Sequence, residues 1–337
     1  MANSPTLKRR MVTFSRTIVA WLVLTPFLPM IALLAAAVDL ARWLMTRKPW
    51  ITVRLLGIGW VYLSAQVAVI VITALQWLAS LAFGAGAATR RQEWTYTLQR
   101  WWVSILMAAM RTLLGVRFEA RDTGAITPGP IILLFRHASI MDNLLPYAMV
   151  ADDAGIRLRW VLKKELLNDP ALDIGGHRTP NYFVDRDSDS PAMERSRIAE
   201  LGSDLDSNEG IILFPEGTRY ARAKFEERMA RLAVSRPDLH EIMAGHDLVL
   251  PPRSGGVVAL LDAGYDVVFG VHSGLEDLRG LGDIWANAPV GRTVLVSFRR
   301  VAAASIPTEP DDRIRWLHEE WAKVDETVRS LRKMSDG

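Results

Sequence analysis

Two long runs without a charged residue constrain this 337-residue chain more than any other feature of its sequence. Residues 17–38 and 55–89 contain no Asp, Glu, Lys or Arg, over 22 and 35 positions. Each run exceeds the roughly 20 apolar residues that a helix needs to cross a bilayer. The first run is too long for a signal peptide and lacks a clear small-residue cleavage pattern. We therefore expect residues 1–89 to form a membrane anchor of two hydrophobic helices; the alternative is an apolar hairpin inside a soluble protein.

The charges around these runs indicate which kind of partner the hairpin has, but not how the hairpin is oriented across the membrane. Residues 1–116 carry 12 Lys or Arg and two acids, a net charge of +10, whereas residues 117–337 carry −7. Basic residues that flank long apolar runs favour anionic lipid headgroups over nucleic acid as the partner. Because both ends of the hairpin and its loop are basic, the excess of positive charge on cytoplasmic loops does not orient it. Two full spans and a hairpin within one leaflet both fit the sequence.

Residues 90–115 are expected to form a third, amphipathic helix. Glu93, Arg100, Ser104 and Arg111 are spaced by seven, four and seven positions, which puts them on one face of a helix. Such a helix can lie in the plane of the membrane interface. An ordinary helix packed on the following domain explains the pattern equally well.

From residue 116 onward, short apolar strands alternate with helical segments. The pattern predicts strands at residues 131–135, 158–162, 182–184, 211–214, 248–250, 267–271 and 294–298. It predicts helices at residues 143–150, 192–205, 221–234, 257–263 and 310–332. Alternating strands and helices predict an α/β fold for one domain over residues 116–337, with functional residues at strand ends.

A histidine and a carboxylate follow the first of these strands. The segment Arg-His-Ala-Ser-Ile-Met-Asp contains His137 and Asp142. The histidine side chain titrates near neutral pH, which suits a general base, and a carboxylate at its other ring nitrogen fixes the tautomer. Asp142 can reach the ring if a turn or helix start follows His137, and Ser139 is a candidate cap for that helix.

A second polar segment, Phe-Pro-Glu-Gly-Thr-Arg, ends another strand at residues 214–219. Gly217 lets the backbone approach a ligand closely, Thr218 offers a hydroxyl, and Arg219 offers a planar fork that fits phosphate. Together the two segments predict acyl or phosphoryl transfer on a phosphorylated substrate.

The pattern HxxxxD followed by FPEGTR resembles the glycerophosphate acyltransferase superfamily, and within it the 1-acyl-glycerol-3-phosphate acyltransferases. Residues 163–170 and 182–186 resemble the family's middle block, and residues 248–256 resemble its last, proline-containing block. The resemblance implies a mixed sheet flanked by helices. It also implies transfer of an acyl chain from a thioester to the free sn-2 hydroxyl of 1-acyl-glycerol-3-phosphate, which gives phosphatidic acid.

The resemblance also implies roles for individual residues. His137 and Asp142 would be the general-base pair. The substrate phosphate would be held by residues of the FPEGTR turn and the middle block, namely Glu216, Gly217, Thr218, Arg219, Lys163 and Arg186. Glu216 either orients Arg219 or touches the substrate, and Lys163 and Arg186 are equally compatible with a solvated surface. No metal and no resident cofactor is implied, because acyl-CoA or acyl carrier protein would bring the thioester. Asn168 and Asp169 depart from the apolar pair expected before Pro170.

Other functions remain open. The chain is compatible with an acyltransferase for another lysophospholipid, and with a non-catalytic lipid-binding membrane protein. A metal-dependent lipid phosphatase is a third reading, but the other five His show no convincing ligand spacing. The lack of Cys excludes a cysteinyl acyl-enzyme. We expect an integral protein of the inner or plasma membrane, with its catalytic domain at the cytoplasmic face and lysophosphatidic acid as its lipid partner.

Overall fold

The computed structural model describes residues 4–185 and 190–335, and the chain groups into two compact units. The first unit comprises Met1–Val116, Leu162–Arg186 and Ala288–Gly291. The second comprises Arg117–Val161, Asp187–Asn287 and Arg292–Gly337. The hydrophobic helices belong to the first unit, and the HxxxxD and FPEGTR segments belong to the second.

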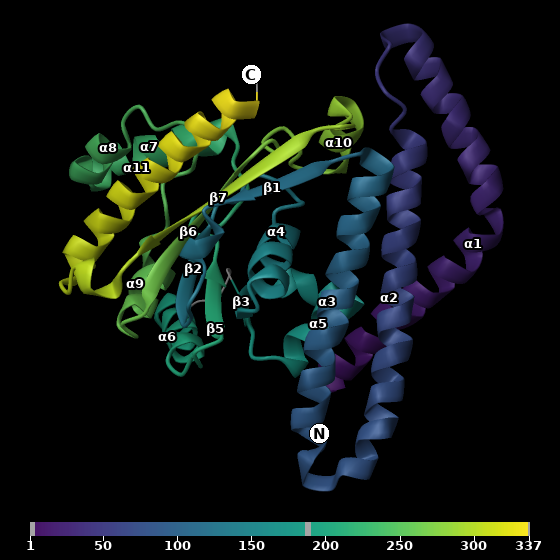
Figure 1. Ribbon diagram of the computed structural model, residues 1–337, viewed down its shortest axis with the longest axis horizontal. Helices are drawn as coiled ribbons and strands as arrows, with labels where there is room; N and C mark the ends of the chain where they lie inside the picture. The colour runs from purple at the N-terminus through teal and green to yellow at the C-terminus, as the bar shows by residue number, and fades with distance from the viewer. Residues whose placement is uncertain (1–3, 186–189, 336–337) are drawn as a thin grey trace. The chain divides into compact units, whose positions relative to one another are not determined.

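The strands form the mixed sheet that the resemblance implies (Figure 1). They are β1 (Arg117–Arg121), β2 (Ile131–Phe135), β3 (Arg157–Lys163), β4 (Tyr182–Val184), β5 (Glu209–Leu213), β6 (Asp266–Ser273) and β7 (Thr293–Val301). Their order is β1-β7-β6-β2-β5-β3-β4. Strand β2 pairs in parallel with β5 and β6, and β6 pairs antiparallel with β7. All five residues of β2 are buried, as expected for a central strand that is covered on both faces.

The strand expected at residues 248–250 is a wrong prediction, since these residues form no strand. The amide of Leu248 donates to the carboxylate of Asp325, and the amide of Leu250 donates to that of Glu216. These backbone groups are therefore occupied by side chains and cannot join a ladder. Strand β1 escaped prediction because three of its five residues are charged and it lies exposed at the sheet edge.

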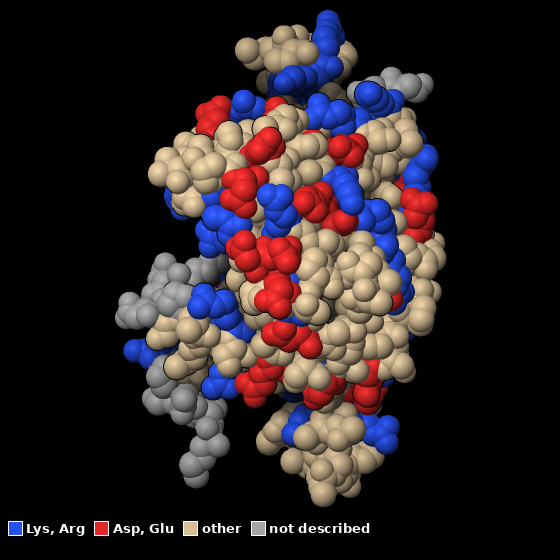
Figure 2. All heavy atoms as spheres, turned by 90° about the vertical axis from the view of Figure 1, so that its left-hand side faces the viewer, with Lys and Arg blue, Asp and Glu red and all other residues tan. Residues whose placement is uncertain are grey.

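Helices cover the sheet in the second unit (Figure 1). They are α4 (Leu144–Pro146), the π-helix η3 (Tyr147–Asp153), α6 (Pro191–Gly202), α7 (Arg222–Ser235), α8 (Pro237–Met243), α9 (Ser254–Leu261), α10 (Leu281–Asn287) and α11 (Pro310–Ser335), with short 3₁₀ turns η2 (Thr123–Ala125) and η5 (Ala303–Ser305). Helix α11 packs its Trp316 and Trp321 rings against Phe269 of β6, with centroids 6.1 and 6.3 Å away. The face displayed in Figure 2 carries acidic and basic side chains interspersed with one another.

The first unit begins with the predicted hairpin of apolar helices, α1 (Ser4–Thr46) and α2 (Thr52–Ser80). Asp39 closes the hairpin, because its carboxylate accepts from the amides of Ile51, Thr52 and Val53 at 2.9–3.1 Å. Among the described residues, Thr6–Thr46 and Thr52–Leu114 are long and apolar enough to cross a membrane by length and composition.

The rest of the first unit includes η1 (Leu81–Gly86), α3 (Ala87–Leu114), η4 (Lys164–Asn168) and α5 (Pro170–Arg178). Helix α3 matches the predicted third helix and ends at Gly115, whose φ of 66° favours glycine. Asp169 caps α5 by accepting from Leu172 N at 2.9 Å, and it also accepts from Gln66 of α2 at 2.7 Å. The polar residue at this departure from the family pattern therefore has a structural role in this chain.

Candidate functional site

The pairing of β2 with β5 brings the two sequence motifs together. Leu134 of β2 lies opposite Leu213 of β5, so the HxxxxD and FPEGTR segments leave the same edge of the sheet. Two hydrogen bonds join them directly. The His137 amide donates to Glu216 Oε1 at 2.7 Å, and the Tyr220 amide donates to the His137 carbonyl at 3.0 Å. The backbone of His137 is thus held on one side by Glu216 of the FPEGTR segment and on the other by Tyr220, the residue that follows this segment.

Asp142 folds back onto His137 through a tight turn. Its Oδ2 lies 3.2 Å from His137 Nδ1 and accepts from the amides of Ala138 and Ser139 at 2.5 and 2.7 Å. Burial alone would raise the pKa of the Asp142 carboxyl group, but the ring of His272 and the hydrogen bond with His137 outweigh it and hold that pKa well below its usual range. Asp142 is therefore an ionised partner for the imidazole over the physiological pH range.

The remaining ring nitrogen of His137 is its free functional group. Because Nδ1 faces Asp142, Nε2 is the nitrogen left for a substrate. The side chain is 12% exposed, and its ring lies 4.7 Å from that of Phe214. A partly exposed imidazole with a buried carboxylate behind it can accept a proton from a hydroxyl group.

Ser139 does not cap a helix, contrary to the expectation from the sequence. The helical segment begins only at Leu144, and the Ser139 hydroxyl donates to the Leu278 carbonyl at 2.7 Å and accepts from the Met141 amide at 3.2 Å. The serine therefore fixes the turn that returns Asp142 to His137.

Glu216 lies inside the protein and holds backbone segments of the site together by hydrogen bonds. Its side chain is fully buried, and its two oxygens accept from the amides of His137 and Leu250 at 2.7 and 3.0 Å. Burial raises the pKa of this carboxyl group to about 7, against the charge of Arg136. Through these contacts Glu216 holds three segments together, and its contact with a phosphate stays a prediction.

The three residues after Glu216 form the exposed part of the motif. Gly217 has a φ of 64°, which favours glycine, and a Cβ atom there would come within 3.1 Å of the Arg253 side chain, which would have to shift. The Thr218 hydroxyl accepts from Lys224 Nζ at 2.8 Å. Arg219 donates one N–H to the Arg279 carbonyl at 2.5 Å. Lys224, which the sequence motifs did not single out, thus joins the turn.

The positions of Lys163 and Arg186 in the middle block leave their phosphate contacts as predictions. Lys163 ends β3 and belongs to the first unit. Arg186 lies outside the described residues. Within residues 4–185 and 190–335, no group of three His, Cys, Asp or Glu side chains is placed to hold a metal ion.

A pair of opposite charges next to the site, in which the arginine is fully buried, was also missed by the sequence motifs. Arg136, next to His137, is fully buried and donates to Glu276 at 2.8 Å and to the carbonyls of His272 and Leu248 at 2.6 and 3.0 Å. Burial of Glu276 opposes its ionisation, but the Arg136 charge prevails and lowers the pKa of Glu276 to about 2. The only available signal was an arginine after a fully apolar strand, which requires an internal acceptor.

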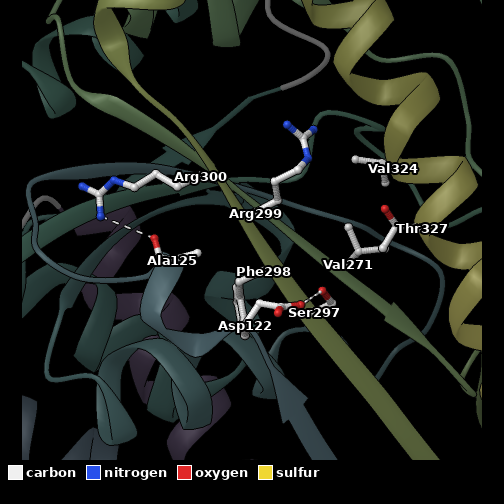
Figure 3. Close-up of a pocket in the computed structure, with 9 residues that line it drawn as sticks. All are labelled: Asp122, Ala125, Val271, Ser297, Phe298, Arg299, Arg300, Val324 and Thr327. Carbon is white, nitrogen blue, oxygen red and sulfur yellow. Dashed lines mark hydrogen bonds between the residues drawn. The ribbon is translucent and has the colours of Figure 1, made fainter.

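A groove beside the sheet is lined by none of the residues described above at the His137 site. It encloses about 400 Å³ and is lined by Asp122, Ala125, Val271, Ser297, Phe298, Arg299, Arg300, Val324 and Thr327. Figure 3 shows Val324 and Thr327 of α11 on one side, and Asp122 hydrogen-bonded to Ser297 on the other. The groove is therefore no part of the His137 site.

Comparisons with known proteins agree with this geometry. Residues 117–268 match the family model described as Acyltransferase. The chain is similar in fold to the crystal structure of the 1-acyl-sn-glycerophosphate (LPA) acyltransferase PlsC from Thermotoga maritima, with a TM-score of 0.52 and 17% identity over 83% of this chain and 96% of that one. Among curated proteins, no match was found. Residues 117–268 therefore resemble the acyltransferase family that the sequence motifs indicated.

The buried Glu216 predicts a pH-dependent stability. Its pKa is raised from 4.5 to about 7, so between these values the folded protein holds a proton that the unfolded chain releases. Its contribution to the free energy of unfolding is therefore complete below pH 4.5 and is lost as the pH rises through 7, by at most about 3 kcal/mol. Glu216→Gln keeps one acceptor oxygen but cannot titrate. Melting temperatures measured from pH 5 to pH 8 should show the wild type losing more stability than this variant; parallel curves would contradict the assignment.

Proposed function

We propose that this acyltransferase moves an acyl chain from an acyl thioester to the free sn-2 hydroxyl of 1-acyl-glycerol-3-phosphate, giving phosphatidic acid. The observation that supports this most directly is the joining of two motifs. The His137 backbone is hydrogen-bonded to Glu216 and to Tyr220, the residues on either side of the Gly217–Arg219 turn, so the base and this turn are held next to each other. A base beside an anion-binding turn suits a substrate that carries both a hydroxyl and a phosphate.

In the proposed reaction His137 Nε2 takes the proton of the lysolipid hydroxyl as its oxygen attacks the thioester carbonyl. Asp142 stays ionised and stabilises the imidazolium that forms. Collapse of the tetrahedral intermediate breaks the carbon–sulfur bond, and the departing sulfur takes the proton from His137. The proton lost by the hydroxyl ends on the departing sulfur, so no acyl-enzyme is needed, which agrees with the absence of Cys.

The phosphate of the acceptor is proposed to bind at the turn formed by Gly217, Thr218 and Arg219. Arg219 uses one of its five N–H donors on the Arg279 carbonyl, which holds the guanidinium at the rim of the site. Its other donors suit a bidentate contact with phosphate oxygens. Lys163 and Arg186 remain candidates for the same ligand on the basis of the family resemblance, and acyl-CoA or acyl carrier protein is the proposed co-substrate.

The apolar hairpin is proposed to insert into the inner or plasma membrane, with the catalytic region at the cytoplasmic face. Helix α1 carries large apolar side chains that expose over half of their surface, among them Phe27 at 53% and Leu34 at 62%. Exposed apolar surface of this extent is costly in water and stable in lipid. A membrane anchor would let the enzyme draw its lysolipid from the bilayer without exposing the acyl chain to water.

Substitution of the catalytic pair tests the proposed chemistry. His137→Ala should lower kcat by about 10²–10⁴-fold, the range typical of a lost general base, while the melting temperature changes little. Asp142→Asn should cost less, because the base remains but its orientation and charge partner do not. His240→Ala, on α8, is the matched control and should keep the wild-type rate. Retention of more than about a tenth of the rate by His137→Ala would remove this residue as the base.

Arg219→Ala should raise the KM for lysophosphatidate strongly and leave the KM for the acyl thioester unchanged, because it removes the fork that grips phosphate. Arg219→Lys should rescue poorly, since a point charge does not reproduce the fork. Arg222→Ala serves as the control, because Arg222 is a nearby exposed arginine already paired with Glu226 and Asp247. Equal acceptor KM values for the wild type and Arg219→Ala would exclude the proposed contact.

Charged substitutions on α1 test the membrane anchor. They are preferable to deletion of residues 1–89, which would also take Arg9 and Arg10 from the buried Asp173. Phe27→Asp combined with Leu34→Asp puts two carboxylates on one face of the apolar run, at a cost of roughly 2.5–3.5 kcal/mol each in lipid. The wild type and the exposed control Val234→Lys should resist carbonate extraction, whereas the double variant should be released and should lose activity on vesicles more than on a short-chain lysolipid. Release of the wild type by carbonate would count against an integral anchor.

A further inference from the structure

The carboxylate of Asp142 has two oxygens in very different surroundings. Oδ2 carries the contacts with His137 and with the amides of Ala138 and Ser139. Oδ1 is buried and faces His272 Nε2 at 3.2 Å, although the two atoms are not aligned for a hydrogen bond. Among the described residues, Oδ1 has no other hydrogen-bond partner. A buried carboxylate oxygen without a donor costs on the order of 1–3 kcal/mol, so the neighbouring ring nitrogen is its natural partner.

His272 is fixed where it can serve as that donor. It is completely buried at the end of β6, and its ring stacks on Phe135, with centroids 5.8 Å apart and planes at 21°. Its backbone carbonyl accepts from the buried Arg136. The charged groups that face it are Asp142 from the turn after β2, Arg136 from the same segment, and Glu276 from the loop after β6. His272 also lies beyond residues 117–268, so the family match does not include it.

We propose that His272 is a positioning residue for acyl transfer, with a proton on Nε2 that it donates to Asp142 Oδ1. The carboxylate is then held from both sides, by the amides of Ala138 and Ser139 on Oδ2 and by His272 on Oδ1. This fixes the plane of the carboxylate and keeps Oδ2 directed at His137 Nδ1. Neither ring nitrogen of His272 has a hydrogen-bond partner among the described residues, and Nε2 is the one that faces an acceptor, Asp142 Oδ1.

The role of His272 is therefore confined to orientation. During the reaction the hydroxyl proton moves to His137 Nε2 and then to the leaving sulfur, while the His272 proton stays on its ring. His272 touches neither substrate, so its loss should lower kcat and leave both KM values unchanged. The kinetic test of this role, a change in kcat, rests on the proposed function. The structural test, the protonation of the His272 ring seen by NMR, does not.

A double-mutant cycle with Asp142 tests this role. His272→Leu should lower kcat by about 10–100-fold, the range typical of residues that orient a functional side chain from behind. In an Asp142→Asn background the same change should cost nothing further, because His272 acts only through that carboxylate. His272→Gln carries an amide nitrogen near the position of Nε2 and should recover most of the rate. His318→Leu, which removes another buried histidine on α11, is the control and should cost the same in both backgrounds.

Equal losses from His272→Leu in the two backgrounds, a raised KM, or no loss would each overturn the proposal. Nitrogen NMR of the wild-type protein with labelled histidine tests the His272–Asp142 contact whether or not lysophosphatidate is the substrate. The resonances of His272, assigned by their absence in His272→Gln, should report a proton on Nε2 and should shift in Asp142→Asn. A ring protonated only on Nδ1 overturns the positioning role even if lysophosphatidate is the substrate. If the wild type is inactive on lysophosphatidate, the expected resonances still support the His272–Asp142 contact.

Discussion

The parallel pairing of β2 with β5, fastened by the buried Glu216 carboxylate, is the arrangement on which the site depends. Parallel neighbours end at the same edge of a sheet, so two motifs 79 residues apart leave their strands side by side. Glu216 then accepts from the amides of His137 and Leu250, which joins the proline-containing block at residues 248–256 to the two motifs. The position of the base is thereby set by backbone contacts, and a change in any of the three segments should be felt at His137.

Next to these segments the chain buries several ionisable groups, among them Arg136, Asp142 and His272. Arg136 and Glu276 form one pair, and Asp142 with His272 forms another. Removing charges from water is costly, and a buried pair is often no more stable than apolar residues of the same volume. The side chains of Arg136, Glu276 and Asp142 also bond backbone groups of the loops that border the site, so these contacts fix the geometry of those loops. Burying Asp142 and His272 costs stability, but it fixes the orientations of the carboxylate and of the imidazole ring.

Much of this could be predicted from the sequence, and the exceptions have physical reasons. The strands with continuous apolar residues, such as Ile131–Phe135, were predicted at their observed positions, and the apolar hairpin followed from its length alone. The strand at residues 248–250 was wrong because side-chain carboxylates take its amides, a contact that no local pattern reveals. The same limit applies to Glu216 and His272: their residue types were visible, but their partners lie 34–130 positions away and depend on the sheet order. The motif pair His137 and Asp142 was predictable because both ends of the contact lie within five residues.

The central claim is that this site transfers acyl groups to a lysolipid that carries a phosphate monoester. The most direct measurement offers the purified protein an equimolar mixture of lysophospholipids in vesicles, with acyl-CoA or acyl carrier protein as the donor, and identifies the products by mass. The account predicts that phosphatidic acid is the main product with at least one donor, and that its formation stops in the His137→Ala variant. Preferred acylation of a different lysophospholipid would show that the proposed acceptor is wrong. The absence of any acylated product with both donors would contradict the proposed acyl transfer itself.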